Sequence, residues 1–212
     1  MANEIEFKIN VGKSGIKKIL DTKYFNSKNL CLYGFNIKRD MYFESSKEGE
    51  VIRIRQAQSV GMSNIDRFFD DIKFNEKSFS ESYLCYKNKG FSEDGKTEIT
   101  NEYETQINDP EPFIKIMESK GVNVHFTKEK KSVLIEFVND IYKNSYHIEL
   151  VCVNNKHWYI EIEWIDEINE NSVHFNTVDK IISYLDGLVL ELGFDPFNSK
   201  DPRPWKEIVK ND

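Results

Sequence analysis

The sequence has few of the features that mark membrane, secreted or zinc-binding proteins. No apolar run in its 212 residues approaches the roughly 18 that span a bilayer. Charge appears within the first four residues, so we expect no signal peptide. The three cysteines, Cys31, Cys85 and Cys152, are odd in number and widely spaced. This spacing favours reduced thiols in the cytoplasm over a disulfide framework or a zinc site.

Positive charge is also in short supply. The chain has 29 Lys and Arg against 36 Asp and Glu, a net charge of −7, which argues against broad nucleic-acid binding but allows a local basic site. No repeat, low-complexity tract or linker divides the chain, so we expect one domain over residues 1–212. The histidines show no metal-ligand spacing, and we expect each to be structural or exposed: His125, His147, His157 and His174.

Alternating apolar and polar residues dominate what is present. Fifteen Phe, ten Tyr and three Trp favour strands over long helices. The alternation and its turn residues predict strands over 4–9, 30–36, 38–44, 51–55, 83–87, 99–107, 124–137, 146–153 and 158–164. Turns are expected at Asp94-Gly95 and at 154–156. The excess of strands with hairpin connections predicts an α+β fold, with an antiparallel sheet closed or nearly closed into a barrel.

Three helices are expected among these strands. The first covers roughly 11–24. The second has Asp109 as its N-cap and Pro110 at its first position, with a buried stripe of Phe113, Ile116 and Met117. The third is capped near Asn176 or Thr177 and ends at Gly193. A last helical turn is allowed near the C-terminus. The irregular segment 57–80 fits an insertion, either a lid or a pair of extra strands.

Several strands carry like charges on one face. Carboxylate pairs lie on strands near the two ends of the chain, at Glu4 and Glu6 and at Glu161 and Glu163, whereas cations lie on the strands between them. For any one strand, a solvated surface face would explain the pattern. If the sheet closes with these faces inward, the interior is a polar tunnel. Clustered glutamates would need a divalent cation such as Mg²⁺ or Mn²⁺, and clustered Arg and Lys would need an anion such as phosphate.

The order of these motifs resembles the CYTH superfamily, the triphosphate tunnel metalloenzymes. Glu4-x-Glu6-x-Lys8 resembles the N-terminal ExExK motif of that family. The similarity continues along the chain, in order, at 40–43, 52–55, 86–87, 101–104, 128–130, 161–163 and 203–205. The resemblance spans essentially the whole chain, and it implies a closed eight-stranded antiparallel barrel with a few flanking helices.

The resemblance also implies roles for individual residues. The metal ligands, direct or through water, would be Glu4, Glu6, Glu161 and Glu163. The triphosphate would bind to Lys8, Arg53, Arg55, Lys87, Lys128, Lys130 and, from the C-terminal segment, Arg203. Of these, Glu4, Glu6, Lys8, Arg55 and Lys87 would be catalytic. Lys131 is an alternative to Lys130, and Glu102 and Glu104 could join the acidic side or pair with neighbouring lysines. Tyr42 and Phe43 are expected in the core, and Trp158 and Trp164 as buried strand aromatics.

Three functions follow from the resemblance. The leading hypothesis is a Mg²⁺- or Mn²⁺-dependent phosphohydrolase acting on inorganic triphosphate, thiamine triphosphate or a nucleoside triphosphate. A class IV adenylyl cyclase is the alternative, weakened because the sequence shows no base pocket and no histidine-phenylalanine pair ahead of Glu4. The third is a module that binds a nucleotide or polyphosphate without turnover. An RNA 5′ end is disfavoured as substrate but left open, no membrane partner is expected, and a homodimer is allowed.

Overall fold

The computed structural model describes residues 2–21, 30–45, 47, 49–62, 64–74, 79–93, 95–137, 146–164 and 177–210. His174, Asn176 and Asp94, to which the sequence assigned roles, lie outside the described residues. Among the described residues, no helix is long and apolar enough to cross a membrane.

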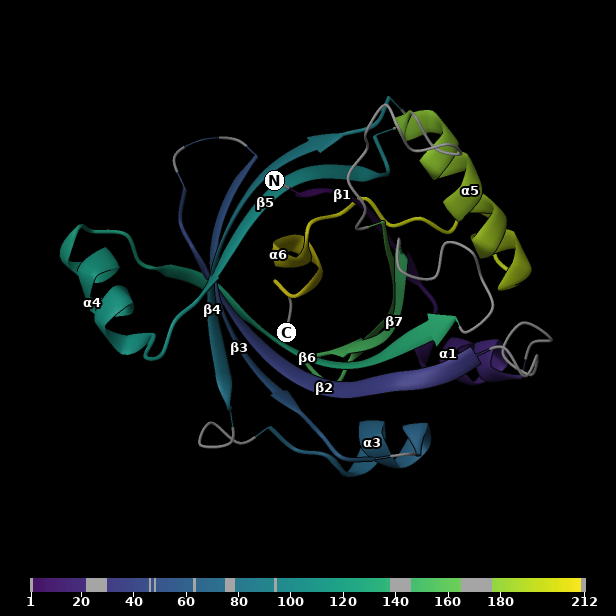
Figure 1. Cartoon of the computed structure of the whole chain (residues 1–212), viewed down its shortest axis with the longest axis horizontal. Coiled ribbons are helices and arrows are strands. Elements are labelled where there is room, and N and C mark those ends of the chain that lie inside the picture. Colours follow the sequence, from purple (N-terminus) through teal and green to yellow (C-terminus); the bar gives the residue numbers. More distant parts are fainter. Residues whose placement is uncertain are drawn as a thin grey trace.

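Eight strands close into one antiparallel barrel, in the order β1-β5-β4-β3-β2-β6-β7-β8 and back to β1 (Figure 1). The strands are β1 (Ala2–Asn10), β2 (Leu30–Phe43), β3 (Glu50–Ser59), β4 (Glu81–Phe91), β5 (Glu98–Gln106), β6 (Val124–Phe137), β7 (Tyr146–Val153) and β8 (His157–Trp164). The described helices are α1 (Gly12–Leu20), α3 (Ile65–Asp71), α4 (Glu111–Ser119), α5 (Val178–Glu191) and α6 (Trp205–Ile208). The predicted α+β barrel is therefore confirmed.

The hydrophobic core lies on the outside of the barrel wall. Ile5, Phe7 and Ile9 on β1 are almost fully buried and belong to one apolar cluster with residues of α1 and α5. Because side chains alternate across a strand, the intervening Glu4, Glu6 and Lys8 face the barrel interior. In Figure 1, α1 and α5 lie outside the wall. This arrangement buries apolar side chains under helices and leaves the interior to charged ones.

Most strand boundaries agree with the sequence prediction. The turn between β7 and β8 uses two non-glycine residues with positive φ, Asn154 at 49° and Asn155 at 57°, a conformation that asparagine tolerates better than most residues. The prediction of two short strands over 30–44 is wrong, because β2 is one strand of 14 residues. Its pairing with β6 has two register shifts, between Leu32 and Gly34 and between Tyr42 and Phe43, and neither interrupts the strand.

The segment 57–80 forms neither a lid nor extra strands in its described part. Beyond the end of β3 it contributes the short helix α3, which begins at the capping residue Asn64. Phe68 is fully buried, with its ring 5.2 Å from that of Phe35 on β2. Helix α3 therefore packs on the outside of the barrel, as Figure 1 shows.

Helix α4 exists where predicted, but its predicted buried stripe is wrong. It begins at Glu111, one residue later than expected, with Pro110 as its N-cap. None of its residues is buried, and Ile116 is 57% exposed. Phe113 does contact Phe43, with the ring centroids 5.9 Å apart. The helix projects from one side of the barrel in Figure 1, so its apolar periodicity has little surface of this chain to pack against.

A charged tunnel as the candidate active site

The barrel encloses a cavity of about 670 Å³. Residues of all eight strands line it, and helix α6 contributes Trp205. Nearly every sequence-predicted site residue is on this wall: Glu4, Glu6, Lys8, Arg53, Arg55, Lys87, Lys128, Lys130, Glu161 and Glu163. Segments far apart in the sequence thus bring their charges into one space.

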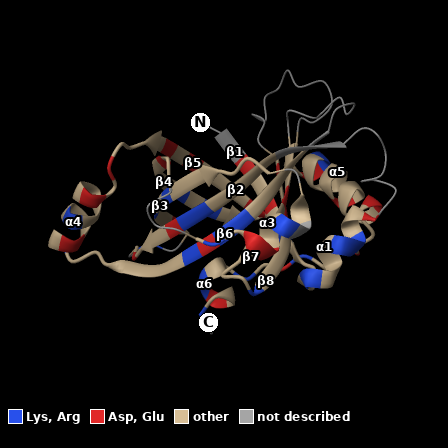
Figure 2. Ribbon diagram, turned by 90° about the horizontal axis from the view of Figure 1, so that it is seen from below, with Lys and Arg blue, Asp and Glu red and all other residues tan. Residues whose placement is uncertain are grey.

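Acidic and basic residues occupy opposite halves of the tunnel wall. The wall carboxylates come from the neighbouring strands β5, β1, β8 and β7, except Glu81 on β4. The cations come from the neighbouring strands β4, β3, β2 and β6, except Lys8 on β1. Figure 2 shows these basic and acidic bands along the barrel strands. The interior is therefore polarised across its width.

The acidic half crowds carboxyl groups together. Glu6 lies opposite Glu163 in the β1–β8 register. Burial and the nearby Glu4 and Glu6 carboxylates raise the pKa of Glu163 well above its usual range. Burial and a hydrogen bond with Glu102 raise the pKa of Glu4 to about 7. These carboxyl groups cannot all ionise easily while they lie so close together. A hard divalent cation bound among them would stabilise their ionised forms.

Glu102 completes a carboxyl pair with Glu4. Lys87 Nζ lies 2.8 Å from Glu4 Oε2 and also pairs with Glu102, while Arg53 Nη2 is 3.2 Å from Glu102 Oε1. Although burial opposes it, the hydrogen bond with Glu4 and the charges of Lys87 and Arg53 lower the pKa of Glu102 to about 2. Glu102 is therefore the ionised member of the pair, and Glu4 is the member that takes up a proton as the pH falls through about 7.

The basic half is organised around one buried aspartate. Asp40 is fully buried and accepts hydrogen bonds from Arg55 Nε at 2.8 Å and Arg55 Nη2 at 3.1 Å. Lys128 Nζ is 3.3 Å from the same carboxylate, and Arg53 Nη1 is 3.7 Å from it. Although burial opposes it, these three cations hold the pKa of Asp40 well below its usual range. Asp40 therefore fixes three cations in one orientation toward the tunnel.

Lys130 and Lys131 lie on opposite faces of β6. Lys130 lines the tunnel and pairs with Glu161 and, at 2.5 Å, with Glu149. Lys131 is equally buried, but its ammonium donates to the backbone oxygen of Phe69 in α3, at 2.8 Å. Of the two alternatives left by the sequence, the geometry places only Lys130 where a tunnel ligand could contact it.

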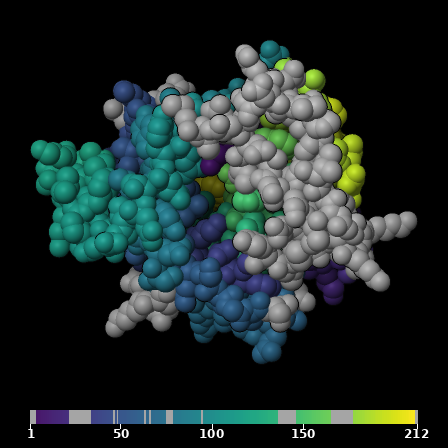
Figure 3. Space-filling model, viewed as in Figure 1, coloured from purple at the N-terminus to yellow at the C-terminus, as the bar shows by residue number. Residues whose placement is uncertain are grey.

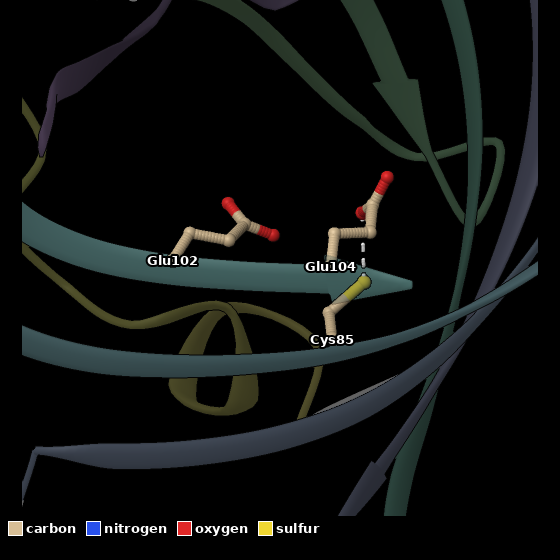
Figure 4. Close-up of side chains that lie close together, drawn as sticks. All are labelled: Cys85, Glu102 and Glu104. Atoms are coloured by element: carbon tan, nitrogen blue, oxygen red, sulfur yellow. Dashed lines mark hydrogen bonds between the residues drawn. The ribbon is translucent and has the colours of Figure 1, made fainter. Parts of the chain in front are cut away.

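Cys85, Glu102 and Glu104 form a second group whose side chains converge (Figure 4). Their ligand atoms lie within 4.8 Å of one another, so by distance alone they could hold a metal ion. Burial raises the pKa of the Cys85 thiol to about 11, and its sulfur lies 2.8 Å from Glu104 Oε2. A protonated thiol that donates to a carboxylate explains this group without an ion. Among the described residues, the predicted ligands Glu4, Glu6, Glu161 and Glu163 do not form a second group of three with this spacing.

Helix α6 closes one end of the tunnel. Val151, Val153 and Tyr159 point into the barrel there and form an apolar cluster with Ile208 and Val209. In Figure 3 the hollow opens toward the viewer, and dark yellow atoms of the C-terminal segment lie at its base. At this base the Trp205 ring faces two ammonium groups, Lys128 Nζ at 4.7 Å and Lys8 Nζ at 5.7 Å.

Arg203 is the one predicted site residue that the structure places elsewhere. Its side chain is 54% exposed and holds Asp201 through Nε at 2.9 Å and Nη2 at 2.6 Å. The C-terminal segment instead presents Trp205 to the tunnel, two residues further on. Sequence reasoning had identified this tail as part of the site, but not the side chain that reaches the cavity.

The sequence analysis also missed several wall residues: Lys38, Tyr42, Glu98, His147 and Glu149. Tyr42 was expected in the core and His147 at a structural or exposed position, whereas both line the tunnel. The signal was available, because Lys38, Asp40 and Tyr42 alternate along β2 just as Glu4 and Glu6 do along β1. Dividing β2 into two strands hid this continuous face. Trp164, in contrast, is buried on the outer wall as expected, and Trp158 is only partly buried against the same apolar cluster.

Comparison with known proteins supports the fold. No family model matches the sequence, and no curated protein matches it significantly. Among solved structures, the PH1012 protein of Pyrococcus horikoshii is similar at 19% identity, with a TM-score of 0.68 over 97% of this chain and 99% of that chain. The Hippeastrum protein HpAC1 is described as a candidate adenylyl cyclase with a dominant triphosphatase activity. It matches at 13% identity, with a TM-score of 0.53 over 91% of this chain and 88% of that one.

The same barrel also occurs in a different context. A chain of the Schizosaccharomyces pombe Mediator head module matches at 7% identity and a TM-score of 0.57, over 89% of this chain and 94% of that one. At such identities the comparisons show a shared fold. What happens inside the barrel has to be argued from the residues of this chain.

Proposed function

We propose that this chain, whose fold is that of the triphosphate tunnel (CYTH) superfamily, is a divalent-metal-dependent hydrolase of triphosphates. The single observation that carries the proposal is the division of the tunnel wall into an acidic half and a basic half. A polyphosphate chain with bound metal ions has the matching division, because its anionic oxygens face cations on one side and its metal ions face carboxylates on the other.

The acidic half supplies the metal site. Glu4, Glu6, Glu161 and Glu163 would hold Mg²⁺ or Mn²⁺, directly or through water. The raised pKa values of Glu4 and Glu163 support this assignment, because burial and neighbouring carboxyl groups disfavour their ionised forms, which a bound cation would stabilise. When bound, the ion would neutralise charge that develops on the phosphoryl oxygens.

The basic half supplies the phosphate site. Arg53 and Arg55 present guanidinium groups, whose planar donors match phosphate oxygens. The side chains of both arginines line the tunnel. Lys128 and Lys130 add two further charges from β6, and Lys87 adds one from β4.

The reaction that this arrangement supports is the attack of water on a terminal phosphorus. The bond between that phosphorus and the bridging oxygen breaks, and negative charge accumulates on the leaving diphosphate. Arg53 and Arg55, fixed by Asp40, are positioned to stabilise that charge without reorganising. Lys87 on β4 pairs with Glu4 on β1, and Lys130 on β6 pairs with Glu161 on β8. Substrate phosphates would take over these lysines and free the carboxylates for metal.

Product analysis tests the proposal. The protein is incubated with tripolyphosphate, ATP, GTP and thiamine triphosphate, each with Mg²⁺ or Mn²⁺, and the products are separated. We expect orthophosphate from at least one of them and none in excess EDTA. Pyrophosphate together with a cyclic nucleotide would instead identify a cyclase. Tight binding without any product would identify a binding module and overturn the proposal.

A further inference from the structure

Lys130 is shared by two glutamates that belong to neighbouring strands. Its ammonium group pairs with Glu149 Oε2 on β7 at 2.5 Å and with Glu161 Oε2 on β8. These two glutamates lie opposite each other in the β7–β8 register. Lys130 and Glu161 are only 4% and 8% exposed, so little water screens the attraction of the two carboxylates for this ammonium group. The two glutamates therefore compete for one buried cation.

Glu149 is held in place by a lysine on each of its oxygens. Lys38 Nζ on β2 donates to Oε1 at 2.9 Å, while Lys130 pairs with Oε2. Lys38 lies opposite Lys130 in the β2–β6 register, so the two ammonium groups reach the carboxylate from adjacent strands. Although burial opposes it, the charges of Lys130 and Lys38 hold the pKa of Glu149 well below its usual range. Glu149 is thus an ionised carboxylate whose orientation does not depend on Lys130 alone.

Glu161 cannot keep Lys130 if it binds a metal ion. An ammonium group on its carboxylate takes up an oxygen that the ion requires and repels the charge of the ion. Glu149 can retain the lysine: although burial opposes it, both glutamates raise the pKa of Lys130, and Glu149 has the larger effect. Among the described residues, these two are the carboxylates that form ion pairs with Lys130. Without Glu149, metal binding would leave a buried ammonium group uncompensated, which is costly.

We infer that Glu149 is a positioning residue that takes over Lys130 when Glu161 binds the divalent metal ion. Glu149 acts through Lys130 and does not need to touch the ion. This also gives Lys38 a role, because it fixes Glu149 from β2 without pairing with a predicted metal ligand. The inference deepens the proposed function and rests on it, because it concerns how the metal ion enters the same site.

The test is a double-mutant cycle on the affinity for Mn²⁺, measured without substrate in mildly alkaline buffer on the full-length protein. We expect Glu149→Gln to weaken Mn²⁺ binding by about tenfold, because Lys130 then has no second carboxylate to accept it. In the Lys130→Gln background, the same substitution should change the affinity by less than about twofold, because no ammonium group remains to be moved. Lys130→Gln alone should bind Mn²⁺ at least as tightly as the wild-type protein.

Glu81→Gln is the matched control for the loss of one negative charge from the tunnel wall. Glu81 is an exposed wall carboxylate on β4 that accepts a hydrogen bond from the Tyr83 hydroxyl at 2.8 Å. Within the described part of the chain, it forms no ion pair with Lys130. Its substitution should change the affinity for Mn²⁺ by less than about threefold, since the lost charge is exposed to solvent.

An equal loss of affinity from Glu149→Gln in both backgrounds would overturn the inference, because Glu149 would then act as a ligand or through its charge alone. So would an unchanged affinity in Glu149→Gln. If that variant does not fold by circular dichroism, weaker Mn²⁺ binding in Lys130→Gln overturns the inference by itself. These outcomes leave the hydrolase proposal standing, whereas a wild-type protein that binds no Mn²⁺ contradicts the proposed metal site.

Discussion

Asp40 and Arg55 form a two-point hydrogen-bonded pair inside the barrel wall, with Arg55 Nε at 2.8 Å and Nη2 at 3.1 Å from the two carboxylate oxygens. The carboxylate is fully buried, and the arginine side chain is only 19% exposed. The pair matters because it joins the fold to the site. It balances the cations that the barrel has to bury, and it orients the donors that a phosphate would meet.

Removing this carboxylate should therefore cost both stability and activity. We expect Asp40→Ala to lower the free energy of unfolding by about 3 kcal/mol, since it leaves buried cations uncompensated. The measurement is chemical denaturation. The matched control is Asp70→Ala, because Asp70 pairs with Lys13 at 2.7 Å but both side chains are more than half exposed. That variant should change stability by less than about 1 kcal/mol. Equal effects of the two substitutions would refute the role assigned to Asp40.

Lys130 and Lys131 provide a matched pair on one strand. Lys130→Gln should reduce kcat/KM for the triphosphate substrate by about a hundredfold, because it removes a charged donor from the tunnel. Lys131→Gln should leave kcat/KM within about threefold and lower stability instead, by about 1 kcal/mol, through loss of the bond to the Phe69 oxygen. Steady-state kinetics and thermal melting separate the two outcomes. If Lys131→Gln loses more kcat/KM than Lys130→Gln, the face of β6 that we assign to the tunnel is the wrong one.

Activity should decline at alkaline pH as Lys128 loses its charge. Burial, together with the neighbouring Lys130 and Arg55, lowers the pKa of Lys128 to about 8, although Asp40 and Glu161 oppose the shift. The ammonium is charged below this pKa and neutral above it, so phosphate affinity is lost as the pH rises through 8. We expect kcat/KM at saturating Mg²⁺ to fall above that pH. Lys128→Arg should move the fall to higher pH, since arginine keeps its charge. If the fall in kcat/KM stays at the same pH in Lys128→Arg, the group that titrates there is not Lys128.

Metal binding should strengthen as the pH rises through 7. Glu4, with its pKa raised to about 7, has to lose a proton before it can act as a ligand. The apparent dissociation constant for Mn²⁺, measured without substrate, should fall by about tenfold between pH 6 and pH 8. Cys85→Ser should leave this affinity unchanged, because the thiol stays protonated throughout that range. Loss of Mn²⁺ binding in Cys85→Ser would favour the group formed by Cys85, Glu102 and Glu104.

The alternation of polar and apolar side chains along the strands predicted most of the site. Glu4 and Glu6 alternate with Ile5 and Phe7, and the same alternation at 160–163 places Glu161 and Glu163 inward. The charged face of each such strand can be predicted from the residues of that strand alone. The relation between faces comes from barrel closure, which the excess of antiparallel strands also predicted.

What the sequence could not predict depends on contacts between distant segments. Val151 and Val153 occupy inward positions of β7, and their apolar character is explained only by α6 docking inside the barrel. Lys200 is buried because its backbone pairs with Ile9 near the end of β1 and its side chain pairs with Asp186 on α5. The prediction that the apolar stripe of α4 is buried was wrong, because periodicity predicts an apolar face but not whether another segment covers it.

The most direct test of the account is tripolyphosphate hydrolysis by the wild-type protein and by Glu161→Gln, with Mg²⁺ or Mn²⁺ and with EDTA. Glu161 is 8% exposed on the tunnel wall, and Gln preserves its shape while removing its charge. The account predicts metal-dependent orthophosphate release by the wild-type protein and a loss of at least about a hundredfold in the variant, with the fold intact by circular dichroism. Equal rates for the two proteins, or release that persists in EDTA, would contradict a metal-dependent reaction inside the tunnel.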